Sequence, residues 1–111
     1  MHALDALGEP VRRRLVELIA VGDQPAGALA ARIGAEYGIS QPATSRHLRV
    51  LREAGLVESR VRGPERLYSI RAESFDEVEG WVAGVRAHWD QALDALATEV
   101  ARGRRGRSDD E

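Results

Sequence analysis

The sequence predicts a small, mainly α-helical domain with one β-hairpin and about five helices, assembled as a homodimer through its first and last helices. Apolar residues recur at helical spacing in four segments before residue 56, alternate with polar residues between 56 and 70, and then return to helical spacing in one long segment. The 111 residues fit a single domain, and 43% apolar with 31% charged residues is the composition of a globular chain.

The first two helices are predicted from turn-forming residues and apolar spacing. Residues 3–7 are expected to form a short helix that ends near Gly8. Pro10 suits the first turn of the second helix, because the backbone N–H that proline lacks would be unpaired there. Gly22 is expected to terminate this helix. Its inward stripe consists of Leu15, Leu18 and Ile19.

The third helix is predicted between two breaks in the pattern. Asp23 or Gln24 is a candidate N-cap, with Pro25 in the first turn. Gly38 ends the helix and leaves only Gly38 and Ile39 as the connection to the next one. The residues expected to face inward are Leu29 and Ile33, with Tyr37 as a further candidate.

The fourth helix begins with a strong capping residue. Ser40 is expected to be its N-cap, Pro42 lies in its first turn, and Gly55 closes it. Its core stripe, at positions i, i+4 and i+7, consists of Thr44, Leu48 and Leu51.

A β-hairpin and a long helix are expected to complete the fold. Residues 56–62 and 66–70 have strand character, with a Gly-Pro-Glu turn at 63–65. Ser74-Phe75-Asp76-Glu77 is a capping box that opens a helix to about Val100. Two helices joined by a very short connection and followed by a hairpin have the layout of a winged helix-turn-helix. We therefore expect one such domain over residues 1–101, for DNA binding and dimerisation, and a disordered tail over residues 102–111.

The outer face of the fourth helix has the residues of a DNA-reading helix. Small side chains at its front end let the backbone approach the base edges of the major groove, while polar groups and arginines contact bases and phosphates. The alternative is an ordinary solvated amphipathic helix, and the basic hairpin that follows makes DNA binding the favoured interpretation. The expected DNA-binding residues of this helix are Ser40, Gln41, Ala43, Thr44, Ser45, Arg46, His47 and Arg49.

Charge is distributed unevenly along the chain. Residues 40–71 hold seven Arg and three Glu, a net of +4, whereas residues 72–101 hold one Arg and seven acidic residues, a net of −6. A basic module can present a positive face to DNA although the whole chain has a net charge of −2. The wing residues expected to contact phosphates or the minor groove are Arg60, Arg62, Gly63 and Arg66. For any one of these arginines, a solvated strand edge is the alternative.

Three segments resemble the ArsR/SmtB family of bacterial winged-helix repressors. They are residues 7–15 (LGEPVRRRL), 39–57 (ISQPATSRHLRVLREAGLV) and 66–68 (RLY). The resemblance covers roughly residues 3–100 and implies a homodimeric repressor whose fourth helix enters the groove while the hairpin acts as the wing. The sequence departs from the family pattern in the extra turn at residues 35–38 and in Thr44, where many members have Val.

The last helix carries a continuous apolar seam, spaced as in a coiled coil over nearly three heptads. The seam consists of Phe75, Val78, Val82, Val85, Trp89, Ala92 and Leu96. Because this surface is wider than the core of one small domain requires, we interpret it as a dimer interface; packing on its own domain is the alternative. The expected interface residues are Leu4, Leu7, Val78, Trp81, Val82, Val85, Trp89, Leu93 and Leu96. A dimer predicts a palindromic operator.

No cofactor and no metal site are expected. The resemblance implies metal sensors built from cysteines in the third helix or from His and carboxylate sets in the last helix. This chain has no Cys, and His88 is followed three residues later by Gln91. The Arg12-Arg13-Arg14 cluster is expected to form ion pairs with Glu9 or Glu17 rather than to bind DNA backbone.

Enzymatic activity is not expected, because the sequence has no phosphate-binding loop and no catalytic set. A cytoplasmic location is expected, since no run of eighteen apolar residues and no secretory signal is present. Two alternatives stay open. One is a repressor gated by a small organic ligand that is bound near Trp81 and Trp89, and the other is a winged helix used for protein–protein contact.

Overall fold

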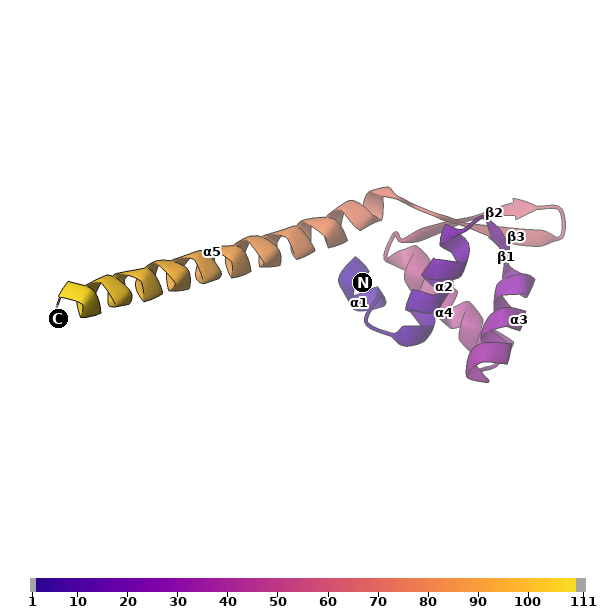
Figure 1. Cartoon of the computed structure of the whole chain (residues 1–111). Helices are drawn as coiled ribbons and strands as arrows, with labels where there is room; N and C mark the ends of the chain where they lie inside the picture. The colour runs from indigo at the N-terminus through magenta and orange to yellow at the C-terminus, as the bar shows by residue number, and fades with distance from the viewer. Residues whose placement is uncertain (1, 110–111) are drawn as a thin grey trace. The chain divides into compact units, whose positions relative to one another are not determined.

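The computed structural model describes residues 2–109, with side chains as far as Arg104 (Figure 1). The chain divides into two compact units, one ending at Val78 and the other beginning at Glu79. The elements in chain order are α1 (Ala3–Ala6), α2 (Pro10–Ala20), β1 (Gln24–Pro25), α3 (Ala26–Tyr37), α4 (Gln41–Glu53), β2 (Val57–Arg62), β3 (Glu65–Ile70) and α5 (Glu73–Asp109). The predicted winged helix-turn-helix order is confirmed.

Local capping explains where α3 and α4 begin and end. Gly38 adopts the left-handed conformation with φ 69°, and its N–H donates to the Gly34 carbonyl at 3.0 Å, which ends α3. Ser40 then accepts the Ala43 N–H on its hydroxyl oxygen at 3.2 Å, as predicted for the N-cap of α4. Only Gly38, Ile39 and Ser40 separate the two helices, which fixes the tight turn between them.

The sheet has one strand more than the predicted hairpin. The strand order is β1-β3-β2, with both pairings antiparallel. In the hairpin the register runs from Val57 opposite Ile70 to Arg62 opposite Glu65, and Gly63 takes φ 58° in the turn.

Strand β1 corrects the predicted start of the third helix. Gln24 pairs with Tyr68 and Pro25 with Leu67, and Pro25 is the N-cap of α3 rather than part of its first turn. The backbone of Pro25 is extended, with ψ 147°, a conformation that pairs with a neighbouring strand and also serves as an N-cap. A two-residue strand has no periodicity of its own, so only the partner strand reveals it.

The core lies between α1–α4 and the sheet, and it contains the predicted stripes of α2, α3 and α4, with Leu18 only partly buried. Thr44, Leu48 and Leu51 are all buried, which confirms the inward stripe of α4. The inward orientation considered for Tyr37 is wrong, because this side chain is 42% exposed next to the left-handed turn. The buried hydrophobic residues of the core are Ala3, Ala6, Val11, Leu15, Val16, Ile19, Leu29, Ile33, Leu48, Leu51, Leu56, Val57 and Tyr68.

Helix α5 differs from the prediction at both ends. It begins at Glu73, and the Ser74 hydroxyl donates to the Gly55 carbonyl instead of capping the helix. It continues to Asp109 rather than ending near Val100, so the part of the expected disordered tail up to Asp109 is helical; residues 110–111 lie outside the described residues. Arg and Ala favour helix, and a single Gly costs only about 1 kcal/mol, which an established helix tolerates.

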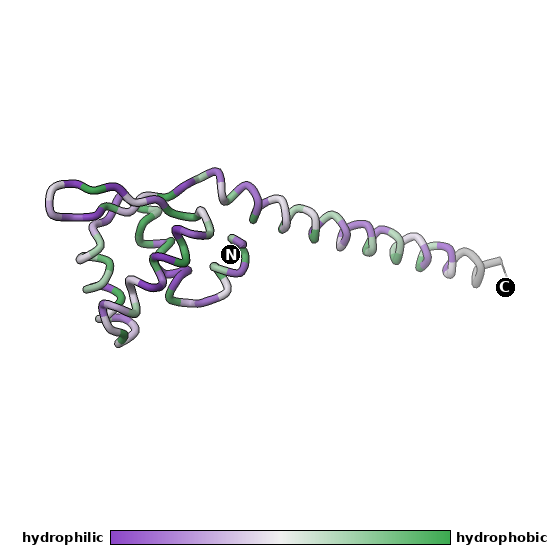
Figure 2. The backbone as a smooth tube through the Cα atoms, turned by 180° about the vertical axis from the view of Figure 1, so that it is seen from behind, coloured by the Kyte–Doolittle hydropathy of each residue, from purple (hydrophilic) through white to green (hydrophobic). Residues whose placement is uncertain are grey.

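Phe75 and Val78, at the start of α5, pack against the core of the first unit. Figure 2 shows apolar positions recurring from turn to turn along the rest of α5. None of the helices in the described part of the chain is long and apolar enough to cross a membrane.

Candidate nucleic-acid interface

The outward face of α4 presents polar side chains to solvent. Gln41, Ser45, Arg46 and Arg49 are exposed, as is the capping residue Ser40. Within the described part of the chain, the guanidinium groups of Arg46 and Arg49 form no hydrogen bond or ion pair. Their donors are therefore not committed to other groups of the protein and can bind an external acceptor.

Thr44 does not belong to this face. Its side chain is 0% exposed, and its hydroxyl donates to the Ser40 carbonyl at 3.2 Å. From the sequence, Thr44 is expected both on the core stripe and among the DNA-binding residues, and its buried position excludes the second role in this conformation. Ala43 is half-buried and still reaches the surface.

His47 is held against α2 by an arginine. Arg12 Nη1 lies 3.4 Å from His47 Nδ1, and since a guanidinium can only donate, the imidazole nitrogen accepts. The same arginine donates through Nε to the Ala6 carbonyl at 2.6 Å, while Glu9 Oε2 lies 3.9 Å from His47 Nδ1. Arg12 thus links the C-terminal end of α1 to the middle of α4, and the His47 side chain is only 24% exposed.

The rest of the Arg12–Arg14 cluster serves the fold as well. Arg14 binds Glu17 at 3.2 Å, as predicted, and also Glu36 of α3 at 3.0 Å, which the sequence did not indicate. The hydrogen bonds from Arg14 lower the pKa of the Glu36 carboxyl below its ordinary value. Arg13 donates to the Leu7 carbonyl at 2.8 Å.

The wing arginines fall into three different environments. Arg60 binds Asp23 at 3.0 Å and the Ser69 hydroxyl at 3.0 Å. Hydrogen bonds to the Asp23 carboxylate, from Arg60 first and also from Ser69, lower its pKa. Arg62, beside the turn at Gly63, is exposed and has no side-chain partner in the described part of the chain. Arg66 has a hydrogen-bond partner but keeps its full charge, because it donates to a hydroxyl and not to a carboxylate.

That hydroxyl belongs to Ser59 and also accepts from the recognition helix. Arg66 Nη1 lies 2.9 Å and Arg52 Nη1 3.5 Å from Ser59 Oγ. Neither Arg52 nor Ser59 was among the residues predicted to bind DNA. Arg52 lies in the last turn of α4, where the prediction stopped at Arg49, and only the packing of β2 against α4 brings Ser59 to it.

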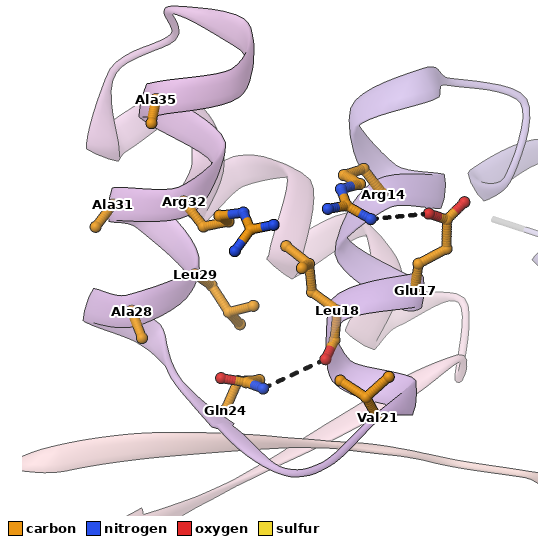
Figure 3. Close-up of a pocket in the computed structure, with 10 residues that line it drawn as sticks. All are labelled: Arg14, Glu17, Leu18, Val21, Gln24, Ala28, Leu29, Ala31, Arg32 and Ala35. Atoms are coloured by element: carbon orange, nitrogen blue, oxygen red, sulfur yellow. Dashed lines mark hydrogen bonds and ion pairs between the residues drawn. The ribbon is translucent and has the colours of Figure 1, made fainter.

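A groove of about 790 Å³ lies between α2 and α3 and is lined by residues of both helices. Figure 3 shows Arg14 and Arg32 extending toward each other across it from the two helices, with Leu18 and Leu29 below them in the view. Val21, 84% exposed, lies at the α2 end of the groove, and Gln24 donates to the Leu18 carbonyl at 3.4 Å. The groove is therefore apolar inside and charged at its rim.

Six of the predicted dimer residues of α5 form an exposed apolar face, whereas Val78 is half-buried against the core of the first unit. Their exposed fractions are 57% for Trp81, 46% for Val82, 50% for Val85, 64% for Trp89, 45% for Leu93 and 58% for Leu96. A hollow of about 270 Å³ lies on this face and is lined by Trp81, Val82, Val85, Arg86 and Trp89. Leu4 and Leu7 of the first unit are half-buried, and Leu7 packs against the core.

Among the described residues, no three His, Cys, Asp or Glu side chains are grouped so that they could hold a metal ion.

Comparison with known proteins gives consistent matches. A family model described as a helix-turn-helix domain matches residues 7–60. The transcriptional repressor SdpR of Bacillus subtilis is 29% identical over 81 residues, which cover 73% of this chain and 86% of SdpR.

Solved structures give further matches over about three quarters of the chain. The crystal structure of a possible transcriptional regulator for arsenical resistance is 36% identical, covering 77% of this chain and 84% of its own, with a TM-score of 0.68. The homodimeric winged helix-turn-helix DNA-binding domain Mb0332 from Mycobacterium bovis, a possible ArsR-family regulator, is 27% identical over 76% of this chain and 74% of its own, with a TM-score of 0.59. The fold, the exposed face of α4 and these relatives together show that the chain belongs to the ArsR family of winged helix-turn-helix transcriptional regulators, a family of regulators and not of enzymes.

Proposed function

We propose that this protein is a dimeric repressor that binds double-stranded DNA at a palindromic operator. The observation that carries the proposal is the outward face of α4, where Gln41, Ser45, Arg46 and Arg49 are exposed and both arginines have no partner in the described part of the chain. In the major groove the short residues allow close approach, Arg46 donates two hydrogen bonds to guanine, and Arg49 binds phosphate. Arg62 at the wing binds the backbone of the flanking minor groove.

Dimerisation through α5 supplies the second half-site. The six apolar side chains from Trp81 to Leu96 on this face are each 45–64% exposed, and exposed apolar residues gathered on one face are typical of an interaction surface. A second copy of α5 covers it with the same residues, as twofold symmetry requires. Two recognition helices related in this way reach half-sites about one helical turn apart, roughly 34 Å.

Repression in this proposal depends on occupancy of the operator and requires no metal. The chain has no cysteine to supply thiolate ligands. The described residues hold no group of three metal-binding side chains, and the face of α3 that borders the groove carries alanines. In this proposal the metal-free protein is the form that binds DNA.

A second candidate, gating by a small organic ligand, is supported by the groove between α2 and α3. Its volume of about 790 Å³ lies in the range of ligand sites, roughly 300–1,000 Å³, and α3 packs directly against α4. Thermal shift screening with small organic acids and aromatics tests this candidate. A ligand that raises the melting temperature of wild-type protein but not of Leu18→Glu protein supports the groove as the site. A ligand that stabilises both equally binds elsewhere.

Selection of bound duplexes from a random DNA library, at physiological salt and without added metal, tests the main proposal. Enrichment of an inverted repeat with half-sites about one turn apart is the expected result. Failure to enrich any duplex contradicts the proposal and favours a winged helix used for protein contact.

Val82→Glu tests the interface in the same protein. It places a charge on the exposed apolar face of α5, where in a dimer the charge would be buried without a partner. We expect sedimentation to report a monomer and the affinity for the inverted repeat to fall, while a half-site duplex is still bound weakly. Glu79→Gln, a change on the exposed part of α5 but off the apolar seam, is the matched control and should remain dimeric. A Val82→Glu protein that stays dimeric overturns the interface.

A further inference from the structure

We propose that Arg52, Ser59 and Arg66 form a preorganised site for one backbone phosphate of DNA, at the junction of the recognition helix and the wing. The inference rests on the proposed function and adds a site to it.

Three elements bring these side chains together. Arg52 lies in the last turn of α4, Ser59 in β2 and Arg66 in β3. Because side chains alternate along a strand, Ser59 is on the same face of β2 as the buried Val57, which is the face directed to the helices. Arg66 is paired with Val61, the next residue of β2 on that face, so it lies diagonally across from Ser59.

The hydrogen bonding at this point is unusual. Ser59 Oγ accepts from Arg66 Nη1 at 2.9 Å and from Arg52 Nη1 at 3.5 Å. Two positive groups therefore converge on a neutral oxygen, although like charges repel. In the described part of the chain neither guanidinium has a carboxylate partner, whereas Arg14 is paired with Glu36 and Arg60 with Asp23.

A phosphate supplies the missing negative charge. Guanidinium groups bind phosphate oxygens through planar pairs of N–H donors, and each of these two arginines has donors left after its bond to Ser59. The Ser59 hydroxyl accepts from both arginines, so its own hydrogen is available to donate to a phosphate oxygen.

The position favours a phosphodiester of DNA over a free anion. Arg46, Arg49 and Arg52 follow one another at spacings of three, so neighbouring residues of this row are adjacent on the surface of α4. A duplex bound by the exposed face of α4 thus meets Arg52 where its backbone leaves the helix and approaches the hairpin.

Arg60 provides the matched control. It lies in the same hairpin and carries the same charge, and the sequence predicted a DNA contact for it. Because it points to the opposite face and its guanidinium is already bound to Asp23 and Ser69, we propose that it does not bind DNA. Loss of Arg60 should therefore alter phosphate contacts much less than loss of Arg52 or Arg66.

The first experiment measures the dependence of DNA affinity on salt, by fluorescence anisotropy with the selected operator half-site and a random duplex. Each neutralised phosphate contributes about 0.9 to the slope of log K against log salt concentration. We expect the Arg52→Gln/Arg66→Gln protein to lose about 0.9 from this slope on both duplexes, the value for one shared phosphate. Each single variant should lose less, and Arg60→Gln should keep the wild-type slope. Circular dichroism confirms that each variant is folded.

The second experiment locates the phosphate. Methylphosphonate groups, which are uncharged, replace the phosphates of the half-site one at a time. We expect one position at which the replacement weakens wild-type binding but has little further effect on the double variant. Ser59→Ala, which removes no charge, should reduce the sensitivity at the same position.

The outcomes separate this site from the proposed function. A wild-type protein that binds no duplex contradicts both. If the wild-type protein binds its operator, but each methylphosphonate weakens binding of the double variant as much as binding of the wild type, the phosphate site alone is overturned. A loss of twice the single-phosphate slope means that the two arginines bind separate phosphates, and this too overturns the shared site.

Discussion

Replacing Thr44 by valine tests whether this residue belongs to the core or to the DNA interface. The substitution exchanges a buried hydroxyl for a methyl group. The lost hydrogen bond to the Ser40 carbonyl is worth about 0.5–1.5 kcal/mol, and burial of a methyl group returns about 0.8 kcal/mol. The Ser40 carbonyl keeps the Thr44 N–H as a donor at 3.0 Å, so no buried acceptor is left unpaired.

The two terms nearly cancel, so we expect Thr44→Val to change the free energy of unfolding by less than about 1 kcal/mol. For a domain of this size that is a shift in melting temperature of less than about 4–8 °C, measurable by calorimetry. Operator affinity, measured by anisotropy, should stay within about twofold, because a residue that is 0% exposed does not contact DNA.

Ser45→Val is the matched control on the neighbouring, exposed position. It should leave stability almost unchanged but weaken operator binding by about 0.5–1.5 kcal/mol, the worth of one hydrogen bond. If Thr44→Val protein is folded and loses as much affinity as Ser45→Val protein, the assignment of Thr44 to the core is refuted for the DNA-bound state.

Three further predictions follow from the other contacts. Arg46→Ala should weaken operator binding more than random-duplex binding while Arg62→Ala weakens both alike, and equal ratios in anisotropy would refute this division of roles. Arg12→Met should lower the free energy of unfolding in urea by about 1.5–3 kcal/mol, since it leaves the Ala6 carbonyl without its charged donor; an unchanged midpoint would contradict the link between α1 and α4. The Arg14 hydrogen bonds hold the pKa of Glu36 below its ordinary value of 4.5, so their stabilisation is complete above that pH and is lost as the pH falls through the lowered pKa. Urea midpoints should therefore fall less between pH 5 and pH 2.5 in Glu36→Gln protein than in wild type, and identical acid profiles would argue against this contribution.

The fold was largely predictable because its signals are local. Gly38, Ser40 and Gly55 mark helix ends by backbone conformation and capping chemistry, which act within a few residues. Strand β1 was missed because two residues carry no periodicity and pair with a strand more than forty positions later. Likewise, Ser74 has the sequence context of a cap, but the Gly55 carbonyl competes successfully for its hydroxyl.

The candidate site was less predictable, because a charge in the sequence does not reveal its partner. Arg60 and Arg62 are two residues apart in one strand, yet Arg60 is paired with Asp23 and Arg62 is unpaired in the described part of the chain. Asp23 belongs to the loop after α2, and only the pairing of β1 with β3 brings this loop to the wing. The side chain of Arg52 was overlooked for the same reason, since Ser59 and Arg66 reach it only through the hairpin register.

The partners of the arginines also explain how a chain with a net charge of −2 can bind DNA. DNA binding is driven by protein cations that neutralise phosphates and release the counterions of the DNA. An arginine already neutralised by a carboxylate of the protein therefore contributes little to it. Arg14 and Arg60 are neutralised in this way and support the fold, whereas Arg46, Arg49 and Arg62 have no such partner in the described residues. The acidic excess, a net of −6 over residues 72–101, lies on α5, where like charges repel one another most strongly at low salt because screening is then weak. Raising the salt concentration should therefore weaken DNA binding while it favours pairing of the acidic helices, and these opposite dependences distinguish the two surfaces in one titration.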